Sequence, residues 1–96
     1  MKPTEHEDFL TLSRALLALE TEQDCQLFFE DICTIKEIQD ISQRFRVAVM
    51  LSEGKNYQEI SAVTGASTAT ISRVNKCLNY GEGYRRVLDK IKEDKQ

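Results

Sequence analysis

Small polar side chains and two cations recur on one face of the stretch from Ser67 to Lys76. At helical spacing, Thr68, Ala69 and Ser72 lie near the start of this face, and Arg73 and Lys76 follow further along it. Short polar side chains let a helix approach base edges in the DNA major groove, and cations beyond them would meet phosphates. This chemistry predicts contacts with double-stranded DNA from seven residues: Ser67, Thr68, Ala69, Thr70, Ser72, Arg73 and Lys76.

The element that must position this face is a helix-turn-helix, which we predict over residues 56–79. Asn56 and Glu59 fit an N-cap and its partner, Gly65 fits a left-handed turn, and Ser67 fits the cap of the second helix. The same pattern would also arise from a helical hairpin with an ordinary solvated face in an all-α domain. The expected buried positions are Ile60 with Val63 or Thr64 in the first helix, and Ile71, Val74 and Leu78 in the second.

Enzymatic chemistry has little support in the composition. His6 is the only histidine and lies near the N-terminus, so we predict neither a catalytic site nor a metal site. The three cysteines, Cys25, Cys33 and Cys77, have no CxxC spacing and are expected to be buried reduced thiols. No apolar run approaches the roughly 20 residues needed to span a bilayer, and the polar N-terminus is unlike a signal peptide. These features predict a cytoplasmic protein that is not an enzyme and makes no membrane contact.

The net charge of −3 conceals a strong polarity along the chain. Residues 1–40 contain three Lys and Arg against ten Asp and Glu, whereas residues 41–92 contain nine against four, giving −7 and +5, and the last three charged residues add −1. The predicted hairpin lies in the basic part. Because a polyanion responds to charge within about one Debye length, roughly 8 to 10 Å in physiological salt, this local excess favours DNA binding.

The remaining segments also have helical periodicity. We expect helices over about residues 5–19, from Thr21 onward, from Thr34 to about residue 53, and over about residues 84–92. The second and third of these are expected to begin at caps formed by Thr21 with Asp24 and by Thr34 with Glu37. In the last helix, the residues expected to be buried are Val87, Leu88 and Ile91. No stretch alternates with period two, so the predicted fold class is all-α, with about six helices in a single domain over residues 1–96. The helices before the hairpin have apolar stripes that are wide for a monomer. Residues 1–53 are therefore predicted to serve mainly in forming a homodimer.

Two stretches resemble the Trp repressor family. They are RFRVAVMLSEG at residues 44–54 and GASTATISR at residues 65–73, and LNYGEGY at residues 78–84 resembles a branch of this family in Gram-positive bacteria. The resemblance covers about residues 22–91. It implies an all-helical, intertwined homodimer that binds DNA, with Thr68, Ala69 and Ser72 facing bases or bridging waters.

The family resemblance also implies an effector site, because Thr34, Arg44 and Arg73 match positions where the family holds its L-tryptophan corepressor. Two positions of this site differ: Val74 replaces a glycine beside the indole and is expected to fill the slot, and Cys77 replaces a serine that helps to hold the amino group. We therefore expect another small effector, or none, more than tryptophan. The candidate effector-binding residues are Thr34, Arg44, Arg73 and Cys77.

Two functions from different classes remain open. The first is a homodimeric transcriptional regulator, expected to be a repressor, that binds a near-palindromic operator through residues 67–76. The second is a dimeric protein-interaction module that keeps the helix-turn-helix scaffold without binding DNA, which the acidic first 40 residues favour.

Overall fold

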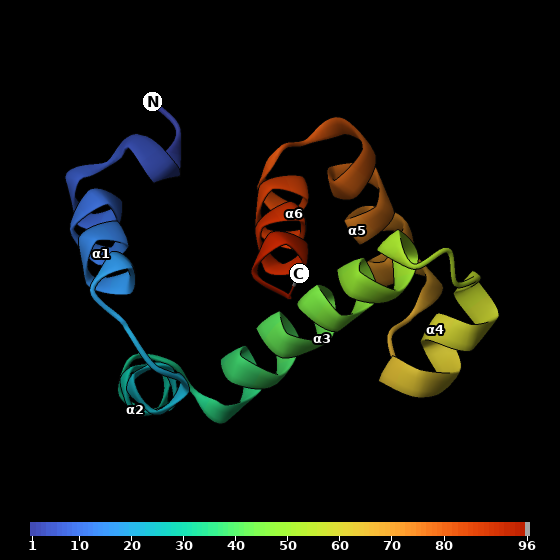
Figure 1. The fold of residues 1–96 in the computed structure, drawn as a ribbon, viewed down its shortest axis with the longest axis horizontal. Helices are drawn as coiled ribbons and strands as arrows, with labels where there is room; N and C mark the ends of the chain where they lie inside the picture. Colours follow the sequence, from blue (N-terminus) through green and yellow to red (C-terminus); the bar gives the residue numbers. More distant parts are fainter. Residues whose placement is uncertain (96) are drawn as a thin grey trace. The chain divides into compact units, whose positions relative to one another are not determined.

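The computed structural model describes residues 1–95, which form six α-helices and one short 3-10 helix, with no strand among them (Figure 1). The all-α prediction is therefore confirmed. The chain divides into two compact units, Met1–Ile38 and Gln39–Gln96, and the boundary lies inside α3. No helix in residues 1–95 has the length and apolar character that a membrane span needs. The elements are η1 Pro3–Glu5, α1 Glu7–Leu17, α2 Glu22–Ile32, α3 Ile35–Ser52, α4 Tyr57–Thr64, α5 Thr68–Tyr80 and α6 Gly83–Lys95.

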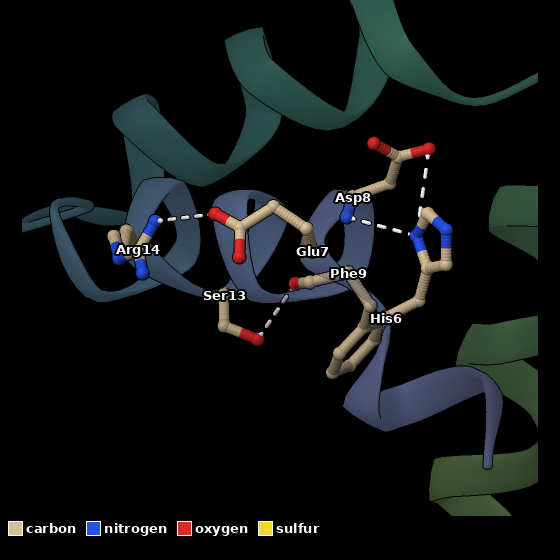
Figure 2. A network of polar contacts seen from close by, with 6 residues as sticks. All are labelled: His6, Glu7, Asp8, Phe9, Ser13 and Arg14. Atoms are coloured by element: carbon tan, nitrogen blue, oxygen red, sulfur yellow. Dashed lines mark hydrogen bonds and ion pairs between the residues drawn. The ribbon is translucent and has the colours of Figure 1, made fainter. Parts of the chain in front are cut away.

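Helix α1 begins at a cap made by His6 (Figure 2). The imidazole Nδ1 of His6 accepts a hydrogen bond from the backbone N–H of Asp8 at 3.1 Å, and the Asp8 carboxylate lies 3.6 Å from the same nitrogen. Glu7, the first residue of α1, also lies 3.5 Å from the guanidinium of Arg14, two turns further along the helix. The helix predicted from about residue 5 thus starts later, because the chain before His6 forms the separate 3-10 turn. The lone histidine of the sequence has a structural role in this place.

Helices α2 and α3 begin with the threonine caps predicted from the sequence. The Thr21 hydroxyl accepts from the backbone N–H of Asp24 at 3.0 Å. At the start of α3, the Thr34 hydroxyl accepts from the N–H of Glu37 at 3.1 Å, and the Glu37 carboxylate accepts from the N–H of Thr34 at 2.8 Å. This reciprocal pair is a capping box, which satisfies two backbone donors that the first turn leaves unpaired.

The first unit has well-formed helices but no buried residue. Phe28 and Phe29 meet edge to face, with ring centroids 5.9 Å apart, and both are half-buried. Large apolar side chains remain exposed, among them Leu17 at 86% and Ile35 at 77%. The wide apolar stripes predicted for this part are therefore open surface in the single chain.

The second unit holds the hydrophobic core, where α4 and α5 pack around the C-terminal half of α3 (Figure 1). The predicted inward positions of α4 and α5 are confirmed for Ile60, Ile71, Val74 and Leu78. Of the two alternatives in α4, Val63 is 62% exposed and Thr64 is half-buried, so Thr64 is the inward one. Over residues 83–94 of α6, Leu88 is the one buried side chain, whereas Val87 and Ile91 are exposed, so their expected burial is wrong for the single chain. The core cluster consists of Val47, Ala48, Met50, Ile60, Ala66, Ile71 and Val74.

Candidate nucleic-acid interface and effector pocket

The hairpin turn forms as the sequence predicted. Asn56 caps α4 by accepting from the N–H of Glu59 at 2.9 Å, and its side-chain amide donates to the Glu59 carboxylate at 3.1 Å. Helix α4 ends at Gly65, whose φ of 74° is left-handed. A Cβ at Gly65 would have no atom within 4 Å, so glycine is favoured there by backbone conformation alone.

The start of α5 is fixed by Ser67 and Thr70. The Ser67 hydroxyl accepts from the backbone N–H of Thr70 at 3.2 Å and donates to the Thr70 hydroxyl at 3.1 Å. Thr70 is half-buried, whereas Ser67 is exposed. The sequence predicted that Ser67 and Thr70 contact DNA. In the structure, their side chains stabilise the first turn of α5, the helix that carries the other five residues predicted to contact DNA.

Those other five predicted residues share the exposed face of α5. Its opposite face is anchored in the core by Ile71, Val74 and Leu78. Because the inward face is fixed by burial, the outward direction of the exposed side chains is also fixed. The exposed set is Thr68, Ala69, Ser72, Arg73 and Lys76. The structure thus brings two hydroxyl side chains, a small methyl group and two cations together on one helix surface.

A hollow of about 320 Å³ lies between α3, α5 and the start of α6. Three of the four predicted effector residues line it, namely Arg44, Arg73 and Cys77. Thr34 lies in the first unit, where its side chain caps α3. Val74 is buried at 3% exposure and forms part of the wall, so it narrows the space without closing it.

Neither guanidinium of this hollow has a hydrogen-bond or ion-pair partner within the part of the chain that the structure describes. The sequence leaves open a purely structural role for Arg44 and Arg73 in which each pairs with a carboxylate, and no such pair is found in residues 1–95. Two unpaired cations in one concave site favour an anionic ligand.

Tyr84 is a pocket residue that the sequence analysis missed. It stacks on Phe45, with ring centroids 6.5 Å apart, and together they line a second, more apolar hollow of about 500 Å³ beside the first. Gly81 sets the approach of α6, because a Cβ there would lie 2.8 Å from the carbonyl oxygen of Cys77. The sequence signal for such a residue was Gly81, directly after α5. A glycine at the end of a helix marks a turn, and residues after a turn can pack against earlier helices.

All three cysteines are free, but their expected burial is wrong for the single chain. Cys25 and Cys77 are exposed and Cys33 is half-buried. The expected burial fails for Cys25 and Cys33 because they lie in the first unit, which has no buried residue. Within residues 1–95, no group of three or more His, Cys, Asp or Glu side chains has a metal-site arrangement.

Comparison with known proteins identifies relatives along almost the whole chain. The family model described as Trp repressor protein matches residues 7–92. The uncharacterized protein YerC of Bacillus subtilis (strain 168) is 53% identical over 83 residues, which are 85% of this chain and 80% of YerC.

Two crystal structures are also similar. A TrpR like protein from Eubacterium eligens ATCC 27750 is 49% identical, with a TM-score of 0.87 over 92% of each chain. A structure from Staphylococcus aureus is 41% identical, with a TM-score of 0.88 over 96% of each chain. Because the family model spans most of the chain and these relatives share both sequence and fold, the protein belongs to the Trp repressor family.

Proposed function

We propose that the protein is a sequence-specific DNA-binding transcriptional regulator, acting as a repressor. The observation that carries this proposal is the exposed face of α5, which is small and polar at its start and cationic at Arg73 and Lys76. The buried base of the helix holds that face in one direction, as major-groove recognition requires. Membership of the Trp repressor family supports the same conclusion.

Each part of the face has its own role in this proposal. Arg73 and Lys76 bind phosphates, while Thr68, Ala69 and Ser72 approach base edges directly or through water. Ser67 and Thr70 hold the first turn so that these side chains enter together.

A homodimer is the proposed active form. The first unit leaves apolar side chains such as Leu17, Leu27 and Ile35 exposed and buries none of its residues. A second copy would remove that surface from water, which is the main driving force for association. A symmetric dimer would also present two α5 helices to half-sites about 34 Å apart, so the operator would be near-palindromic.

The hollow between Arg44 and Arg73 is the proposed effector site. Its two unpaired guanidiniums suit a small anion or carboxylate, and Cys77 lies on the same wall. Buried Val74 limits the room for a large ring, so tryptophan is a weaker candidate than a smaller acid. In the dimer, Thr34 would complete this site, as the family resemblance implies. A regulator of this kind would work in the cytoplasm, where its DNA is.

The test is selection of bound duplexes from a random pool at about 150 mM salt, with and without a mixture that contains tryptophan and other metabolites. Enrichment of a two-fold-symmetric site supports the regulator, and its dependence on the mixture supports the effector site. A folded dimer that enriches no site would contradict the proposal and favour the protein-interaction module, which the net charge of −7 in residues 1–40 also suits.

A further inference from the structure

A side chain of α3 holds the turn of the hairpin. The amide of Gln43 donates Nε2–H to the backbone carbonyl of Thr64, with 3.1 Å between nitrogen and oxygen, in a partly buried position. Thr64 is the last residue of α4, so its carbonyl belongs to the set that a helix end leaves without an intrahelical partner. The bond therefore satisfies the end of α4 and joins it to α3.

The side chain of Thr64 ties the same turn from within. Its hydroxyl donates to the carbonyl of Ile60 at 2.7 Å and accepts from the N–H of Ala66 at 3.1 Å. Ile60 and Ala66 are both buried in the core cluster. Thr64 therefore connects Gln43 of α3 to the N–H of Ala66 through hydrogen bonds to its carbonyl and its hydroxyl. Ala66 directly precedes Ser67, the cap of α5.

The periodicity of α3 explains why Gln43 reaches this turn. Gln43 lies one helical turn before Val47, which is fully buried in the core cluster with Ile60, so both side chains face the hairpin. Gln39 lies one further turn back on the same face, but it is exposed and has no hydrogen-bond partner in the described residues. The chain therefore supplies a matched control at Gln39.

We propose that Gln43 is a positioning residue for DNA recognition, which rests on the proposed function. Its amide fixes the carbonyl of Thr64, and through Thr64 and Ala66 it sets the direction in which α5 leaves the turn. Because base contacts require side chains to be placed within a fraction of an ångström, a looser turn weakens specific binding. Phosphate attraction tolerates such movement, so non-specific binding keeps its strength.

The first measurement needs no DNA. Amide hydrogen exchange at Ala66 is compared by NMR in the full chain and in the variants Gln43→Ala and Gln39→Ala. Since one hydrogen bond typically shifts an equilibrium by about fivefold, we expect Gln43→Ala to raise the exchange rate about fivefold and Gln39→Ala to leave it unchanged. Equal exchange rates in both variants would overturn the proposed hold on the turn.

The second measurement separates positioning from stability. The affinity ratio between the selected operator and a random duplex is compared in the same proteins, well below their melting temperatures. We expect Gln43→Ala to lower this ratio about fivefold with unchanged affinity for the random duplex. A merely destabilised protein would lose affinity for both duplexes equally. If the wild-type protein selects no operator, the proposed function fails; if it selects one and the ratio is unchanged in Gln43→Ala, only the role of Gln43 fails.

Discussion

The two units of the chain begin their helices with the same chemistry and differ in what those helices bury. Thr21 in the first unit and Ser67 in the second each accept a hydrogen bond from a backbone N–H three residues ahead, at 3.0 Å and 3.2 Å. Within residues 1–95, all nine buried hydrophobic residues belong to the second unit. Capping therefore determines where a helix begins, but it does not determine whether the helix packs into a hydrophobic core.

This difference assigns separate tasks to the units. The second unit has an interior that fixes the direction of the exposed face of α5, on which we propose the DNA contacts. The first unit exposes apolar side chains, and in the proposed function a second copy of the chain covers them. Substitutions of apolar side chains in the second unit should therefore mainly affect stability, and those in the first unit should mainly affect dimer formation.

The largest expected effect is on the core of the second unit. Replacing Ile71 by alanine removes a fully buried side chain, and we expect the free energy of unfolding to fall by about 3 kcal/mol. Val63→Ala is the control in the same hairpin, because Val63 is mostly exposed, and it should cost less than about 0.5 kcal/mol. Urea denaturation at one fixed protein concentration measures both. Equal losses would contradict the placement of the core.

The second effect concerns the apolar surface of the first unit. Leu27→Lys combined with Ile35→Lys places two charges where we propose that the copies meet. Burial of each side chain would contribute about 1.5 kcal/mol or more, so we expect the dimer to dissociate at least about tenfold more easily. Sedimentation equilibrium measures the change, with Val63→Lys as the control. A wild-type monomer, or a dimer indifferent to both lysines, would refute the role proposed for this unit.

The sequence predicted the local features of the fold correctly for a physical reason. Caps such as Thr34 with Glu37, and the left-handed turn at Gly65, depend on neighbouring residues only. The face of α5 that carries Arg73 could also be predicted, because burial of three apolar side chains at helical spacing leaves a single outward direction.

Burial could not be predicted equally well, since it depends on which other helix covers a face. The periodicity of α3 did not single out Val47 and Met50, which are buried because α4 and α5 cover that side. Tyr84 was missed as a pocket residue because Gly81 indicates a turn but not the direction in which the chain returns, and that direction places Tyr84 in the hollow beside Arg44 of α3. The bond from Gln43 to Thr64 spans 21 residues and has no signature in the sequence.

The third effect is on DNA affinity and tests the task assigned to the second unit. Arg73→Ala and Lys76→Ala should each weaken operator binding and reduce the slope of log affinity against log salt by about 0.9, because each removes one cation that we propose binds a phosphate. Lys92→Ala is the control, because Lys92 is an exposed cation on α6, outside residues 56–79. Affinities measured between about 50 and 200 mM salt give the slopes. An unchanged slope in Arg73→Ala and Lys76→Ala would favour the protein-interaction module.

The smallest effect compares the two caps directly. Ser67→Ala and Thr21→Ala each remove one cap bond of the same kind, which typically contributes about 1 kcal/mol. If a second copy makes the first unit part of one cooperative fold, both substitutions lower the free energy of global unfolding by that amount. Denaturation followed by circular dichroism distinguishes cooperative unfolding of both units from independent fraying of the first unit. If the first unit frays independently, Thr21→Ala leaves the main unfolding transition unchanged and only reduces the helix signal before that transition. That outcome would mean that residues 1–38 do not share the stability of the core, and the dimer would then need another interface.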